Sequence, residues 1–221
     1  MILGVSEMHL LILRINRNKL LVSLLFLILL FSSPLAQSIP SGVGDMGDEG
    51  CLCHGAKSLS TSVIIDGIPP QWAANNSYQM SIILNSSIEI SDEENARLGG
   101  FRLMVDDGEV IFAENNRTQV INEGYTHTSQ GNQYRQWNFT WTAPSSNDSV
   151  VNFVVFGNAV NSNGQSSGDA WNYYSTTVAG EGYTGVIEQP ADYSDKFLNR
   201  EISLLLFAVI SLIGLFYYST K

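Results

Sequence analysis

Two cysteines and a histidine stand together near residue 50, in the run Cys51-Leu52-Cys53-His54. Thiolate sulfur is a soft ligand and imidazole a borderline one, so this group suits a metal ion such as copper or zinc. It also resembles the motif C-x-x-C-H, in which two sulfurs bond covalently to a haem and the adjacent imidazole binds its iron. Here the spacer between the two cysteines is one residue shorter. Either the loop accommodates the shorter spacing, or only one thioether bond to the haem forms, or the motif binds a different group. A bridge between two oxidised thiols is the remaining alternative, although cysteines two apart close only a small strained ring.

His127 is the first candidate for a second axial ligand of a six-coordinate haem iron. The chain has three histidines, and His9 lies ahead of the folded region, which leaves His54 and His127. An ordinary surface histidine within Thr126-His127-Thr128 is the competing interpretation. Other candidates for the axial position are three methionines, Met46, Met80 and Met104. The last two lie in strand-like patterns, which favours core positions for both.

Acidic residues elsewhere offer weaker candidates. Asp106, Asp107 and Glu109 could hold calcium through oxygen ligands, and so could Asp169 with the polar stretch before it. Neither spacing matches a defined calcium loop, so ordinary turns are favoured. No H-E-x-x-H motif and no phosphate-cradling glycine loop occurs. The sequence therefore favours an electron carrier or a binding protein over a catalytic enzyme.

The composition is that of a folded, acidic protein. Of 221 residues, 44% are hydrophobic and 14% charged, which is enough for one domain with a core. A net charge of −10 opposes any role that depends on neutralising phosphates, which excludes a nucleic-acid partner. Two cysteines are too few for a disulfide-stapled miniprotein.

Both ends of the chain are apolar. A basic stretch, residues 14–19, precedes the apolar run 20–31 and several small residues, which predicts a signal peptide over residues 1–36. Residues 202–218 are apolar except for two serines and a glycine, which predicts a transmembrane anchor and short tail over residues 201–221. Together they predict a single-pass membrane protein at the cell surface, with its main domain extracytoplasmic.

Alternating or dense apolar runs between these ends predict β-strands. They cover residues 62–65, 78–84, 101–105, 110–113, 136–141, 150–156 and 172–178. Residues 101–105 and 110–113 flank an Asp-Asp-Gly-Glu turn and are expected to form a hairpin. Trp137, Phe139 and Trp141 are expected to point inward. Because turn residues recur at spacings of about 8–12 residues and no helical period appears, the sequence predicts an all-β, antiparallel β-sandwich.

The predicted organisation of the exterior part has three segments. A lead-in with the Cys-x-Cys-His motif covers residues 37–60 and is expected to be extended. The β-sandwich domain covers residues 61–179, and a stalk covers residues 180–200.

Five segments, in the same order, resemble the Reeler-like choice-of-anchor V domain family of secreted prokaryotic surface proteins. They are GCLCHG (50–55), GGFRL (99–103), THT (126–128), WNFTWTAP (137–144) and GNAVNSNG (157–164), the last followed by SGD (167–169). The resemblance covers most of residues 50–178 and implies a secreted β-sandwich tethered by a membrane anchor. The cysteine motif of this family resembles a cytochrome c attachment site, usually with a two-residue spacer. It therefore implies Cys51 and Cys53 as attachment positions and His54 as the proximal ligand.

These observations lead to two hypotheses. The first is a membrane-anchored, extracytoplasmic c-type haem protein that passes single electrons to a redox partner protein, with Cys51, Cys53, His54 and His127 around the haem. The alternative is a cell-surface binding or structural module whose loops contact glycans or envelope components. Its cysteines would be oxidised or would bind copper or zinc with the histidine. In both hypotheses the membrane is a partner through the C-terminal helix.

Overall fold

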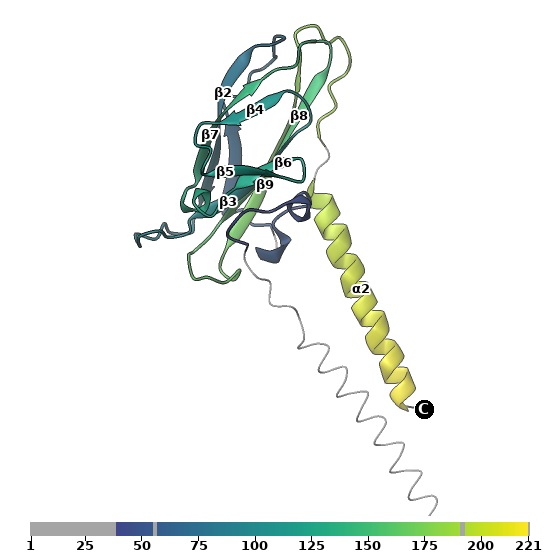
Figure 1. Ribbon diagram of the computed structural model, residues 1–221. Helices are drawn as coiled ribbons and strands as arrows, with labels where there is room; N and C mark the ends of the chain where they lie inside the picture. The colour runs from purple at the N-terminus through teal and green to yellow at the C-terminus, as the bar shows by residue number, and fades with distance from the viewer. Residues whose placement is uncertain (1–38, 55–56, 191–192, 221) are drawn as a thin grey trace, which may run out of the picture. The chain divides into compact units, whose positions relative to one another are not determined.

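The computed structural model describes residues 39–54, 57–190 and 193–220 (Figure 1). The chain divides into two compact units. The unit that ends at Tyr193 holds two antiparallel β-sheets, and the other contains the rest of helix α2 (Tyr193–Thr220). The predicted signal peptide, residues 1–36, lies outside the described residues.

Nine strands form the two sheets, as the sandwich prediction requires. The first sheet has the order β1 (Thr61–Asp66), β2 (Ser77–Ser86), β7 (Gln136–Thr142) and β4 (Glu109–Phe112). The second has the order β5 (Thr118–Ile121), β6 (Gly124–His127), β3 (Gly99–Val105), β8 (Val150–Ala159) and β9 (Ala170–Ala179). All the strand pairs are antiparallel. The all-β, antiparallel sandwich architecture is confirmed.

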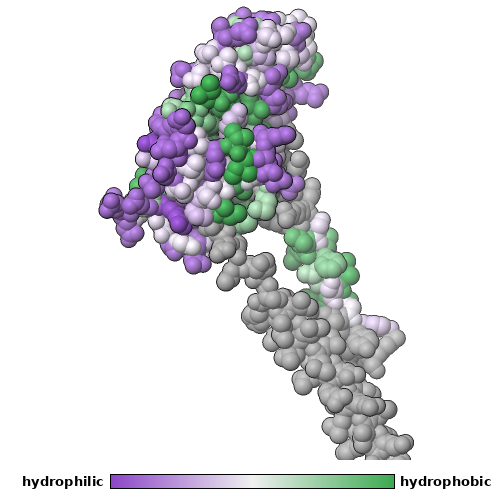
Figure 2. Space-filling view, in the orientation of Figure 1, coloured by the Kyte–Doolittle hydropathy of each residue, from purple (hydrophilic) through white to green (hydrophobic). Residues whose placement is uncertain are grey.

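The core lies between the facing sides of the two sheets. Trp137, Phe139 and Trp141 alternate along β7 and are almost fully buried, which confirms the predicted inward face. The ring of Trp141 packs edge-on against Trp72 and Phe153. Large aromatic side chains bury much apolar surface each, so this cluster contributes strongly to the stability of the sandwich. Figure 2 shows that the outer face turned to the viewer is mostly polar around an apolar strip.

The predicted hairpin of residues 101–105 and 110–113 is wrong. Strand β3 pairs with β6 and β8 in the second sheet, whereas β4 pairs with β7 in the first. The connecting turn passes from one sheet to the other, held by the bonds of Asp106 to the backbone and side chain of Asn152. The carbonyl of Asp107 in turn accepts the indole N–H of Trp141. The acidic turn therefore serves as a sheet crossing, which alternation alone does not distinguish from a hairpin.

Trp72 forms hydrogen bonds with the end of β9 and with the chain that follows it. Its backbone N–H donates to the carbonyl of Ala179 at 3.1 Å, and its carbonyl accepts the N–H of Glu181 at 2.9 Å. Its indole N–H donates to the carbonyl of Val178 at 3.2 Å. Because the Trp72 side chain is completely buried, these three bonds pin the end of β9 to the loop between β1 and β2.

The segment after the sandwich differs from the predicted stalk. Residues 181–190 are irregular, and α2 begins at Tyr193, inside the range predicted as stalk. Among the described residues, we find no helix that combines the length and the apolar character required of a membrane span.

Candidate functional site

The cysteine motif forms a single turn of 3₁₀-helix, η2 (Leu52–His54), closed by a hydrogen bond from the N–H of His54 to the carbonyl of Cys51 at 2.9 Å. Residues three apart eclipse in such a turn, so Cys51 and His54 share a side and Cys53 points elsewhere. Cys53 is exposed and Cys51 is half-buried, and both thiols are free. Burial, with a smaller effect of the neighbouring Cys53, raises the pKa of the Cys51 thiol to about 12.

The chain before the motif is attached to the second sheet, which corrects the expectation of an extended lead-in. It contains a 3₁₀-turn, η1 (Asp45–Gly47). The N–H of Val43 donates to Thr126 Oγ1 in β6 at 3.2 Å. The side-chain amide of Asn132 donates to the carbonyl of Pro40 at 2.9 Å. These bonds hold the motif close to β6.

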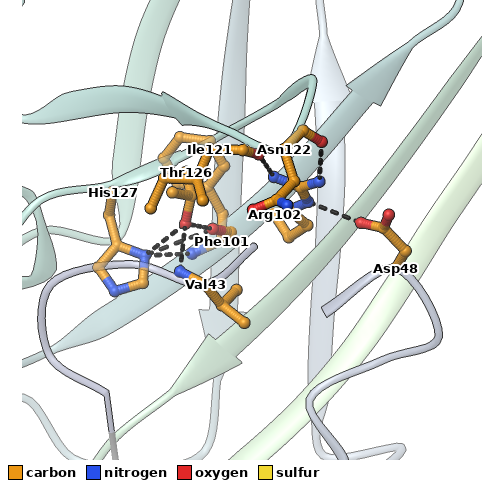
Figure 3. Close-up of polar contacts among 8 residues, drawn as sticks. All are labelled: Val43, Asp48, Phe101, Arg102, Ile121, Asn122, Thr126 and His127. Atoms are coloured by element: carbon orange, nitrogen blue, oxygen red, sulfur yellow. Dashed lines mark hydrogen bonds and ion pairs between the residues drawn. The ribbon is translucent and has the colours of Figure 1, made fainter. Parts of the chain in front are cut away.

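Arg102 in β3 provides the strongest attachment of this segment (Figure 3). Its guanidinium pairs with Asp48 at 2.7 Å and donates to the carbonyls of Ile121 and Asn122. The side chain of Arg102 is only 1% exposed. Gly124 makes room for it, because a Cβ at that position would lie 2.4 Å from Arg102 Cζ. Arg102 therefore joins the lead-in to the turn between β5 and β6.

His54 is oriented by the carboxylate of Asp169, which is distant in the sequence but adjacent in the fold. Its Nδ1 lies 2.7 Å from Asp169 Oδ2, just before β9, and the Asp169 side chain is 1% exposed. Asp169 Oδ1 also accepts the N–H of Asn161 at 3.1 Å. Because an ionised carboxylate only accepts, the Nδ1 of His54 carries the proton and its Nε2 keeps a lone pair. This is the arrangement that orients metal-binding histidines and raises their basicity.

His127 ends β6 and is 8% exposed. Its Nδ1 accepts the N–H of Phe101 at 3.1 Å, and the hydroxyl of Thr126 donates to the carbonyl of Phe101 at 2.7 Å (Figure 3). The imidazole lies directly against Gly100, where a Cβ would be 2.5 Å from His127 Cε1. A glycine is therefore required in β3 for the ring to take this place.

One cavity collects these side chains. Its volume is about 110 Å³. Its polar and sulfur-bearing lining includes Cys51, Cys53, His54, His127, Asn132 and Asn158. Its apolar lining includes Ile39, Pro40, Val43, Met46, Leu52, Phe101 and Val160. The four residues predicted from the sequence as site residues thus line the same cavity.

The other residues considered as ligands, the methionines and the acidic residues, differ in whether they lie at this cavity. Met80 is buried in the core as predicted, whereas Met46 lines the cavity and is 67% exposed. Asp106 accepts hydrogen bonds from Asn152 in β8, and Asp107 accepts the N–H of Gly108 within the β3–β4 turn. Asp169, treated as a turn residue in the sequence, proves to be the partner of His54. Within the part of the chain that the structure describes, no three His, Cys, Asp or Glu side chains form a metal-ion cluster.

The environment of His127 predicts a pH effect on stability. The pKa of His127 is lowered to about 4, mainly by burial; a hydrogen bond to the backbone of Phe101 partly opposes this, and the nearby His54 adds a smaller lowering. An unfolded histidine has a pKa of about 6.5, so the unfolded state binds more protons between about pH 6.5 and pH 4. Stability is thus fully present above this window and is lost as the pH falls through it. We expect a loss of about 2 kcal/mol from pH 7 to pH 4.5.

The measurement is urea unfolding of protein produced without haem, at both pH values, beside the variant His127→Gln. Gln offers an amide oxygen to the N–H of Phe101 but has no titrating group. The pH-dependent loss of His127→Gln should be smaller by about 2 kcal/mol. Equal losses in both proteins would assign the pH dependence to other groups.

No protein-family model matches the sequence, and no curated protein matches it. Solved structures similar to this chain include the reelin-N domain of F-spondin, at 13% identity and a TM-score of 0.39, over 57% of this chain and 88% of that one. The human F-spondin reeler domain is similar at 12% identity and a TM-score of 0.39, over 58% and 96%. A conjugative transposon lipoprotein from Bacteroides eggerthii is similar at 18% identity and a TM-score of 0.33, over 53% and 97%.

Reeler domains are thus among the structural neighbours of this chain. Membership of the choice-of-anchor V family and the haem motif remain predictions from the sequence.

Proposed function

We propose that this protein is a membrane-attached, extracytoplasmic haem protein that transfers single electrons. The observation that carries the proposal is the meeting of Cys51, Cys53 and His54 from the lead-in with His127 from β6 around one cavity. Two thiols beside an imidazole with a free Nε2 form the donor set of a covalently attached haem.

The cavity lining fits such a group in two further respects. Much of it is apolar, as a porphyrin ring requires. In addition, the amide oxygens of Asn132 and Asn158 are buried without a hydrogen-bond partner among the described residues. A polar group held in the cavity would satisfy buried acceptors of this kind.

Each residue has a definite task in this proposal. When bound, haem supplies the iron that changes oxidation state. Cys51 and Cys53 would supply the sulfur that holds the group in place, and His54 Nε2 would be the nitrogen available to its iron. Asp169 fixes the orientation and tautomer of His54, and the apolar wall around Phe101 excludes water from the ring.

The test is a pyridine haemochrome spectrum and an intact mass of the full-length protein, matured in a host with cytochrome c assembly machinery. A haem-sized mass increase that survives denaturation, together with a c-type spectrum, is expected. Colourless protein of unmodified mass would overturn the proposal. Stoichiometric copper or zinc, or a Cys51–Cys53 bridge, would then favour the surface-module alternative.

Asp169 should set the reduction potential of the bound haem. The variant Asp169→Asn keeps a hydrogen-bond acceptor for His54 but removes the negative charge that favours the oxidised iron. For one electron, a tenfold change in the ratio of ferric to ferrous affinity corresponds to about 60 mV, and a rise of that order is expected. Potentiometric titration of the two proteins measures the shift. Asp106→Asn, in a turn of the same chain, is the control, and an equal potential in Asp169→Asn and wild type would contradict the prediction.

Membrane attachment is part of the proposal and rests on the sequence. Residues 1–36 are assigned as the export signal and residues 201–221 as the anchor. Exposed apolar side chains occur along α2, including Leu205, Phe207 and Ile210. Carbonate extraction of membranes tests the anchor, and protease added to intact cells tests the exposure of the domain. Protein recovered in the soluble fraction would exclude the anchor without affecting the haem proposal.

A further inference from the structure

The hydrogen bonds around His127 determine which ring nitrogen carries its proton (Figure 3). The β3–β6 ladder ends at the pair Arg102 and Thr126, so the next backbone N–H, that of Phe101, lies beyond it. That N–H donates to His127 Nδ1 at 3.1 Å. An imidazole nitrogen that accepts a hydrogen bond is unprotonated, so the neutral ring carries its proton on Nε2.

The neighbouring groups agree with this assignment. His127 Nδ1 also lies 3.3 Å from the carbonyl of Phe101 and 3.4 Å from Thr126 Oγ1, but both distances are longer than that to the N–H of Phe101, and the Phe101 carbonyl receives the hydroxyl of Thr126 at 2.7 Å. Thr126 Oγ1 in turn accepts the N–H of Val43. Each donor in this network then has one acceptor. A proton on Nδ1 would instead make the N–H of His127 face the N–H of Phe101, with no acceptor for the latter.

His127 Nε2 makes no hydrogen bond with any described residue, while His127 lines the cavity together with His54. A nitrogen that carries a proton has no lone pair for a metal, but it can donate a hydrogen bond. The two histidines are therefore unlike: Nε2 of His54 has a free lone pair, and Nε2 of His127 has a hydrogen.

We propose that His127 is a hydrogen-bond donor to a small ligand on the haem iron and not its second axial ligand, so that the sixth position is open to water and small anions. This inference rests on the proposed haem function and revises the role predicted for His127 from the sequence. Because donors beside a haem iron decide which external ligands bind there, His127 would favour ligands with an acceptor atom.

The test uses the full-length, haem-loaded protein and azide as the probe. For wild type we expect a high-spin or water-ligated ferric spectrum and saturable azide binding. The variant His127→Leu should keep the haem and its spectrum type and bind azide at least about tenfold more weakly. His127→Gln, which retains an N–H donor, should recover part of that affinity.

Other outcomes are equally decisive. A low-spin wild-type spectrum that becomes high-spin in His127→Leu would make His127 an axial ligand and overturn the inference, while leaving the haem proposal intact. A low-spin spectrum that persists in His127→Leu would give the sixth position to another side chain, such as Met46, and would also overturn it. Protein without haem would refute the proposed function itself. If His127→Leu does not fold, the spin state and azide titration of the wild type decide the question.

Discussion

Replacing Cys53 with serine is expected to remove nearly all covalently retained haem, whereas Cys51→Ser should retain most of it. Cys53 is exposed and directly precedes His54, as the second cysteine does in C-x-x-C-H. Cys51, by contrast, is half-buried. Burial raises the pKa of the Cys51 thiol to about 12, so less of it is thiolate at neutral pH than of an exposed cysteine.

The two variants are matched controls for each other, since each removes one sulfur from the same turn. Haem staining after denaturing electrophoresis measures covalent retention, and the position of the haemochrome band reports the number of thioether bonds. A band typical of one thioether is expected in wild type and in Cys51→Ser alike. If Cys51→Ser loses as much haem as Cys53→Ser, both sulfurs are needed and the shorter spacer is accommodated by the loop.

Arg102→Met is expected to lower the free energy of unfolding by about 3 kcal/mol. Arg102 is almost completely buried, and its removal leaves Asp48 and the carbonyls of Ile121 and Asn122 without their donor. Loss of one partner from a buried ion pair costs about 3–5 kcal/mol, and the lower value applies because Asp48 is 34% exposed. Methionine fills much of the space of the arginine stem but donates no hydrogen bond.

Urea unfolding measures this loss, and limited proteolysis of residues 43–50 tests its cause. Faster cleavage there is expected, because Arg102 attaches this segment to the sheet. Arg117→Met is the control, since Arg117 is partly exposed and its side chain contacts Glu114, at 3.5 Å, and the face of the Tyr134 ring. It should change stability by no more than about 1 kcal/mol. If the two substitutions lower the free energy of unfolding equally, the buried network of Arg102 contributes no more to stability than the ion pair of Arg117.

The sandwich could be predicted where side chains alternate strongly. Trp137, Phe139 and Trp141 give β7 a clear inward face, and the dense apolar run of β8 indicates a central strand. Strands β5 and β6 were not predicted, because each has four residues and mixed polarity. Their turn has positive φ at Asn122 and Glu123, and only the asparagine is a usual signal for that conformation.

The candidate site was predictable in its residue types but not in its contacts. Cys51, Cys53 and His54 are adjacent in the sequence, and His127 was singled out because histidines are scarce. The partnership of His54 with Asp169 spans 115 positions and depends on how β9 is placed. The polar stretch before Asp169 has no periodicity, so nothing local distinguishes its carboxylate from that of a surface turn.

The bonds of Trp72 to Val178, Ala179 and Glu181 have a mechanical consequence for a protein tethered by its C-terminal side. Tension from such a tether enters the sheets at the end of β9 and is first resisted by these three bonds. Asp169 precedes the opposite end of β9, a strand of ten residues or about 30 Å. A pull strong enough to loosen the Trp72 bonds therefore leaves the His54 end of the domain unstrained until the strand itself begins to separate.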